Sequence, residues 1–164
     1  MKVLKRNNFN DLLIPLIGGF AGGYAVSNDL WIIFMPLSLT ILWEGFDKDF
    51  SNFLWGFSFI LASHFWLLYL HPLTWLGFSW IISLVITTII YFVCAIGGGC
   101  LIFLWGYLAQ KLINKKYIFS GNNIDIFLKV LFLCFLWAFG ELILSQTPFF
   151  WIGIGDSLIP GDFY

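Results

Sequence analysis

The sequence contains little charge. Only 10% of its 164 residues are charged and 60% are hydrophobic, whereas about a quarter of the residues are charged in a typical soluble domain. The net charge is −1 and no block of basic residues occurs, which excludes the electrostatic footprint of a nucleic-acid-binding protein. A water-soluble core could not bury this much apolar surface, so the composition indicates a membrane protein.

Motifs for catalysis and metal binding are also missing. The sequence has no Gly-x-Ser-x-Gly elbow, no His-Glu-x-x-His motif and no P-loop. Cys94, Cys100 and Cys134 lie in apolar stretches without Cys-x-x-Cys spacing, so we interpret them as small packing residues. The soluble segments are short loops. We therefore predict no catalytic residue, no metal site, no cofactor and no extramembrane domain within these residues.

The sequence does have long apolar runs. A transmembrane helix needs about 20 apolar residues, with about 17 as the lower limit. We predict an all-α fold: one polytopic transmembrane helical bundle that covers residues 1–164. Its five predicted spans are residues 12–26, 30–43, 53–70, 77–113 and 124–145. The run that contains the fourth span is too long for one straight crossing and has three glycines, Gly97, Gly98 and Gly99, in its middle, so it forms one long span or two.

The basic residues indicate the orientation, because Lys and Arg collect in cytoplasmic loops. If residues 77–113 form one span, every basic residue lies on the same side of the membrane. These residues are Lys2, Lys5, Arg6, Lys48, Lys111, Lys115, Lys116 and Lys129. A split at the glycines would place the last four on the opposite side. We therefore predict one long span, with the N-terminus in the cytoplasm and the C-terminus outside.

Glycines in the first predicted span have the spacing of a helix-packing motif. Gly18 and Gly22 share one helix face, and Gly19 and Gly23 share another, both in the G-x-x-x-G pattern. Close contact with a neighbouring span of the same chain is the favoured interpretation. Homodimerisation is the alternative.

Two polar residues inside predicted spans are candidates for function, because a charge at mid-bilayer costs at least about 2.5 kcal/mol. Glu141 lies near the end of the fifth span and either faces a polar cavity or serves as a structural carboxylate. His64, near the middle of the third span, is a packing histidine or one half of a proton relay with Glu141. The tryptophans lie mostly near predicted span ends, where we interpret them as interfacial anchors.

Two segments resemble one known family in order and spacing. Residues 65–73 read Phe-Trp-Leu-Leu-Tyr-Leu-His-Pro-Leu, and Glu141 follows Trp137 by four residues. Residues 148–157 read Pro-Phe-Phe-Trp-Ile-Gly-Ile-Gly-Asp-Ser, which is similar to the family's Gly-Phe-Pro-Trp…Gly-Tyr-Ser-Gln loop and keeps its tryptophan at Trp151. The family is the bacterial apolipoprotein N-acyltransferases, and the His-Pro-Leu continuation is similar to cyanobacterial members. Leu144 departs from the pattern, since most members have arginine there.

The resemblance implies eight spans and a nitrilase-like domain outside the membrane whose Glu-Lys-Cys triad transfers an acyl chain. The donor would be a phospholipid, and the acceptor would be the N-terminal diacylglyceryl-cysteine of a lipoprotein. This sequence has no counterpart of the catalytic domain, so we expect a truncated or split membrane portion, inactive alone, whose partner would be a separate C-terminal half. Its location would be the bacterial inner membrane, as a multi-pass protein.

The lipid cavity implied by the resemblance has candidate lining residues in this chain. They are His64, Trp137, Glu141 and Trp151. The alternative function is a small non-catalytic membrane protein, such as an assembly factor or a transporter subunit.

Overall fold

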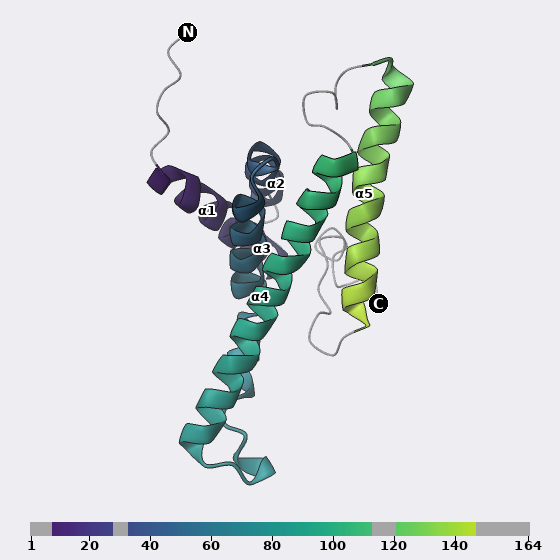
Figure 1. The fold of residues 1–164 in the computed structure, drawn as a ribbon. Coiled ribbons are helices and arrows are strands. Elements are labelled where there is room, and N and C mark those ends of the chain that lie inside the picture. The colour runs from purple at the N-terminus through teal and green to yellow at the C-terminus, as the bar shows by residue number, and fades with distance from the viewer. Residues whose placement is uncertain (1–7, 28–32, 113–120, 147–164) are drawn as a thin grey trace.

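A computed structural model describes residues 8–27, 33–112 and 121–146 of the chain. These residues form helices and short connections, without a strand in the described part, which confirms the all-helical fold. In chain order the elements are α1 (Asn8–Ser27), α2 (Phe34–Gly45), α3 (Asp49–Ser63), the 3-10 helices η2 (Phe65–Leu70) and η3 (Thr74–Leu76), α4 (Trp80–Leu112) and α5 (Asn123–Ser145). Figure 1 shows α4 as the long central element, with α1, α2 and α3 on one side of it and α5 on the other.

The helix α4 is continuous over 33 residues, which agrees with the prediction of one long helix in this run. At 1.5 Å per residue it is about 50 Å long, more than the hydrocarbon core of a bilayer. Among the described helices, α4 and α5 have stretches that are long and apolar enough to cross a membrane, judged by length and composition: Trp80–Lys111 and Asn123–Ile143. The bounds of α5 differ from the predicted span 124–145 by one residue at its start.

The third predicted span, residues 53–70, is not one continuous α-helix, and this part of the prediction is wrong. The helix α3 ends at Ser63, and the chain continues as 3-10 helix from Phe65 to Leu70. The amide of Leu67 donates to the carbonyl of His64 at 3.0 Å, the three-residue spacing that defines the tighter helix. His64 therefore caps the end of α3 and does not lie in the middle of that helix, as the sequence had suggested.

The helix α1 packs against α2 and α3 through the four glycines of the G-x-x-x-G pattern. A Cβ atom on Gly18 would lie 2.6 Å from Cγ2 of Ile41 in α2, and one on Gly22 would collide with Ser38 of the same helix. A Cβ on Gly19 or Gly23 would meet backbone oxygens of α3 at less than 3.0 Å. Both glycine faces are therefore occupied by helices of the same chain.

A hydrogen-bond chain through Ser38 joins the first three helices. Its hydroxyl donates to the carbonyl of Gly18 at 2.6 Å, and its own carbonyl accepts from Nε1 of Trp55 at 3.1 Å. Ser38 and Trp55 are both fully buried. Small residues also let α3 approach α4, because a Cβ on Gly56 would lie 2.6 Å from the carbonyl oxygen of Gly98.

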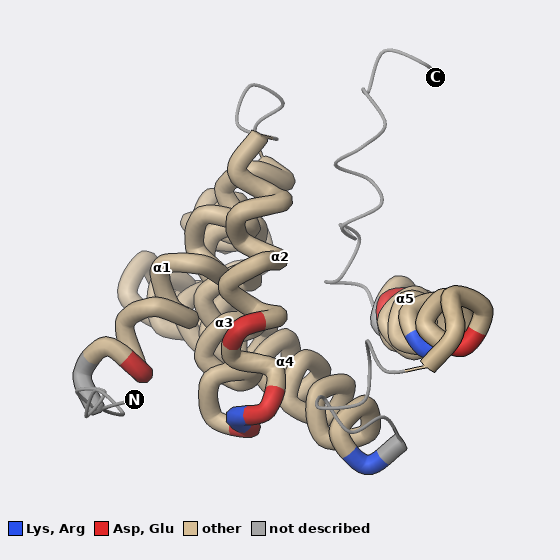
Figure 2. The backbone as a smooth tube through the Cα atoms, turned by 90° about the horizontal axis from the view of Figure 1, so that it is seen from above, with Lys and Arg blue, Asp and Glu red and all other residues tan. Residues whose placement is uncertain are grey.

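Charged side chains collect at one end of the described helices. Nζ of Lys48 and Oδ1 of Asp11 are 2.8 Å apart, and Gln110 near the end of α4 donates to the carbonyl of Phe46 and to Oδ1 of Asp49. These contacts bring the start of α1, the α2–α3 turn and the end of α4 together. Figure 2 looks down on this end and shows blue and red segments at the start of α5 as well. There Nζ of Lys129 lies 2.6 Å from Oδ2 of Asp125. Of the charged residues in the described part, only Glu141 lies toward the other end.

Candidate functional site

The helix α5 brings Glu141 and Trp137 together. Their spacing of four residues places both side chains on one face of the helix, and Nε1 of Trp137 donates to Oε1 of Glu141 at 2.9 Å. Both side chains are half-buried. An indole N–H and a carboxylate form a charge-assisted hydrogen bond when the carboxylate is ionised, so the pair is a polar site on an otherwise apolar helix.

Two further tryptophans surround Trp137. Trp55 of α3 and Trp105 of α4 both meet it edge to face, with ring centroids 6.2 Å and 5.3 Å away and interplanar angles of 77° and 78°. Trp55 is fully buried and Trp105 is 9% exposed. Their interpretation as interfacial anchors is therefore wrong: they belong to the core. Proximity to a predicted span end did not separate a core tryptophan from an anchoring one.

Trp105 also binds the backbone of α5. Its Nε1 donates to the carbonyl of Leu133 at 3.2 Å, one turn before Trp137. Close to Glu141, a Cβ on Gly140 would lie 3.0 Å from Cδ1 of Leu101. Leu133, Trp137 and Gly140 thus lie on the face by which α5 contacts the rest of the described structure.

His64 lies in a separate polar cluster at the end of α3. Its side chain is fully buried, its Nδ1 is 2.8 Å from the hydroxyl of Ser63, and its ring centroid is 6.4 Å from that of Trp66. These contacts fit a packing histidine, whereas the contacts described for Glu141 are with Trp137. The relay between His64 and Glu141 remains a prediction.

The connection between η2 and α4 has a polar contact of its own. Nδ1 of His71 and the hydroxyl of Ser83 are 2.9 Å apart, and the same hydroxyl accepts from the amide of Leu73 at 2.6 Å. Ser83 is fully buried, and Thr87 one turn later is nearly so. This turn was not identified from the sequence, because a serine in an apolar run gives no signal for a partner twelve residues earlier.

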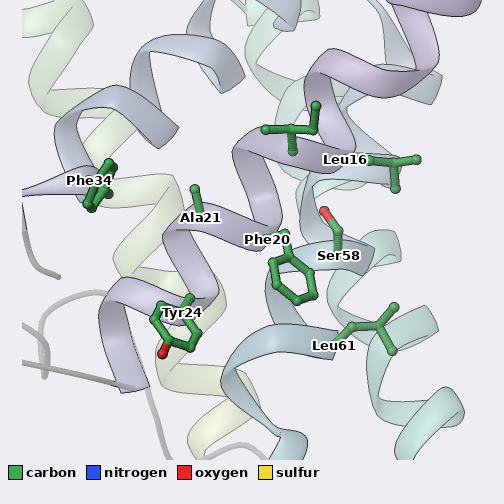
Figure 3. A pocket seen from close by; sticks show the side chains of 8 residues that line it. Leu16, Phe20, Ala21, Tyr24, Phe34, Ser58 and Leu61 are labelled. Carbon is green, nitrogen blue, oxygen red and sulfur yellow. The ribbon is translucent and has the colours of Figure 1, made fainter.

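An apolar groove of about 610 Å³ runs between α1, the start of α2 and α3 (Figure 3). Its lining is Leu16, Ile17, Phe20, Ala21, Tyr24, Phe34, Ser58 and Leu61. The hydroxyl of Ser58 bonds back to the carbonyls of Leu54 and Trp55 within its own helix. The groove thus offers surface to a hydrocarbon chain and little to a polar one.

Within residues 8–27, 33–112 and 121–146, no group of three His, Cys, Asp or Glu residues could hold a metal ion. Cys94 is buried, whereas Cys100 and Cys134 are exposed on the apolar surfaces of α4 and α5. Trp151 and the segment 148–157 lie outside the described residues, so Trp151 as a lining residue of a lipid cavity remains a prediction.

Comparison with known proteins gives relatives from cyanobacteria that are named apolipoprotein N-acyltransferase. One from Prochlorococcus marinus subsp. pastoris is 55% identical over 160 residues, which cover 98% of this chain and 32% of the relative. A second, from another Prochlorococcus marinus strain, is 38% identical over 162 residues, or 99% of this chain and 32% of the relative. One from Parasynechococcus marenigrum is 34% identical over 151 residues, or 92% and 31%. The chain spans about a third of the length of these relatives. No family model and no solved structure matches it.

Proposed function

Because this chain belongs to the apolipoprotein N-acyltransferase family and corresponds to about a third of its relatives, we propose that it forms the membrane portion of such an enzyme. The observation that carries this proposal is the Trp137–Glu141 pair, which holds a carboxylate at 2.9 Å from an indole donor in an apolar helix. A carboxylate inside a membrane segment is costly, and such a residue is by default a candidate for function. We assign Glu141 the role of lining a lipid-accessible cavity that supports a catalytic domain, with Trp137 as its hydrogen-bond partner.

We further propose five spans, with the N-terminus in the cytoplasm and the C-terminus outside. The contacts of Asp11, Lys48 and Gln110 at one end of the helices support this topology. All charged residues of the described part except Glu141 lie toward that end. The helix α4 supports it as well, because it runs unbroken through the three glycines. On this topology Glu141 lies toward the outer face, where the family's catalytic domain works.

The complete protein would transfer an acyl chain from a phospholipid to the N-terminal amine of a diacylglyceryl-cysteine lipoprotein. The chemistry needs a nucleophilic thiolate with a nearby base. Cys94, Cys100 and Cys134 lie in membrane helices and have no such surroundings in the described structure. The catalytic Glu-Lys-Cys domain would therefore come from a separate C-terminal half or from a longer form of this chain, and residues 1–164 alone would be inactive.

Acyl transfer in phospholipid vesicles tests this function. The substrate would be a synthetic diacylglyceryl-cysteine peptide, and mass spectrometry would detect its N-acylated product. We expect product when the coding region is expressed with its continuation or with a separate half that contains the triad, and none from residues 1–164 alone. The Glu141→Leu variant removes the carboxylate that accepts from Trp137. It should lower the rate of acyl transfer about tenfold, which corresponds to about 1.4 kcal/mol in activation free energy.

The matched control is Ile143→Leu, an exposed position on the same helix, which should keep the full rate. Absence of any triad-containing continuation or partner would contradict the proposal and favour a non-catalytic membrane protein. A complete protein that transfers no acyl chain would contradict it as well.

A further inference from the structure

The ring of Trp137 is held from two helices at once. Trp55 and Trp105 both stand nearly perpendicular to it, an arrangement that aromatic pairs favour because ring edges and faces have opposite partial charges. Trp55 is itself fixed, since its Nε1 donates to the carbonyl of Ser38 and its ring stacks on Phe59 at 5.0 Å. The side chains that surround Trp137 are therefore held in place by the core.

Trp105 acts on α5 in a second way, through the carbonyl of Leu133. In an α-helix this carbonyl is also the acceptor for the amide of the residue four positions later, which is Trp137. A carbonyl oxygen has two lone pairs and can accept both donors. The indole of Trp105 thus binds the same peptide group that fixes the backbone of Trp137.

The rotation of α5 about its axis depends on these contacts, because few contacts hold its other faces within the described part of the chain. Large side chains around the rest of the helix are exposed: Phe127, Leu131, Phe135, Phe139 and Leu142. Trp105, by contrast, is buried and is also packed edge to face against Phe46 at 5.5 Å. The fixed partner in this contact is therefore Trp105, and the element being oriented is α5.

We propose that Trp105 is a positioning residue for Glu141. It sets the rotation of α5 and the plane of the Trp137 ring, and so directs the indole N–H of Trp137 to the carboxylate. This inference deepens the proposed function, on which it rests for the role of Glu141 alone. Trp105 itself touches neither the carboxylate nor a substrate in this assignment.

The test follows the indole N–H resonance of Trp137 by NMR, using the full chain with 15N-labelled tryptophan in phospholipid nanodiscs. Trp137→Phe assigns the signal, and Glu141→Leu gives its position when the carboxylate is absent. We expect Trp105→Leu to move the signal most of the way to that position. Trp105→Phe should move it less, because phenylalanine keeps a ring edge against Trp137 but loses the donor to Leu133.

Trp75→Leu is the matched control, because Trp75 is exposed in the turn at the far end of α4, and it should leave the signal in place. A Trp137 signal that stays at its original position in Trp105→Leu overturns the proposal. If that variant fails to fold, an unshifted signal in Trp105→Phe overturns it instead. No acyl transfer enters this measurement, so the expected shifts together with a failed transfer assay would contradict the proposed function and not the positioning role.

Discussion

Gly19 is the residue at which the close approach of α1 and α3 can be tested most directly. A Cβ atom there would meet the backbone oxygen of Trp55, which cannot move without separating the two helices. Alanine is favoured over glycine inside a helix by about 1 kcal/mol, but overpacking costs about 1–3 kcal/mol or more. We expect Gly19→Ala to destabilise the protein by about 1–2 kcal/mol, measured by denaturant unfolding in detergent micelles.

Gly140→Ala is the matched control for Gly19→Ala, since both exchanges add one methyl group inside a helix. The nearest atom to a Cβ at Gly140 is Cδ1 of Leu101 at 3.0 Å, the mobile end of a side chain. The gain in helix propensity should therefore offset the free-energy cost of this contact. The free energy of unfolding should change by no more than about 0.5 kcal/mol. Equal destabilisation by the two variants would show that α1 does not approach the backbone of α3 as described.

Some residues of the helix contacts could be predicted from the sequence and others could not. The four glycines of α1 were identified from their spacing, because that spacing depends only on helix geometry. The spacing of Trp137 and Glu141 could be found in the same way, since four residues make one turn. Trp55 and Trp105 could not, because their roles depend on which helices meet, and hydropathy places a tryptophan in a span without specifying its neighbour.

The turn between η2 and α4 depends on one buried hydroxyl, that of Ser83. Ser83 accepts from the amide of Leu73 and contacts the ring of His71. Ser83→Ala would remove both contacts and leave that amide without its partner, which costs about 1–3 kcal/mol when the group is buried. We expect faster amide hydrogen exchange at Leu73 and across the turn, measured by NMR or mass spectrometry.

Thr87→Val is the control for this change. The hydroxyl of Thr87 is buried in the same helix but bonds only to the carbonyls of Ser83 and Leu84 of α4 itself. Its loss should leave the exchange of the turn unchanged. Acceleration of the turn in both variants would indicate general loosening of α4, and the specific role of Ser83 would then be wrong.

The end of α3 shows why one element differed from its prediction. The length of an apolar run indicates whether a segment can cross a membrane, and this can be predicted from composition. It does not report whether each amide bonds three or four residues back, which changes at His64. The change lengthens the segment: α3 and η2 together extend about 34 Å, enough for a bilayer core of about 30 Å.

For the whole molecule, the positions of charge explain why the topology could be proposed from sequence alone. Short loops that contain lysine stay on the cytoplasmic side of the membrane. Because successive loops alternate between the two sides, the positions of the lysines along the chain determine on which side each loop lies. The structure adds that Asp11, Lys48 and Gln110 meet at one end of the bundle. These contacts could not be predicted from the sequence, because they depend on how α1 and α4 pack around α3.

Labelling of single cysteines in intact cells tests the topology. Thr74 lies in the exposed turn before α4, and Asn123 is the exposed first residue of α5. On the five-span topology a membrane-impermeant maleimide should label Thr74→Cys and leave Asn123→Cys unlabelled until the cells are opened. The unsubstituted protein is the control, because on this topology Cys94, Cys100 and Cys134 lie within the membrane spans and should react in neither case. Labelling of both variants would mean that residues 77–113 cross twice, and labelling of Asn123→Cys alone would reverse the orientation.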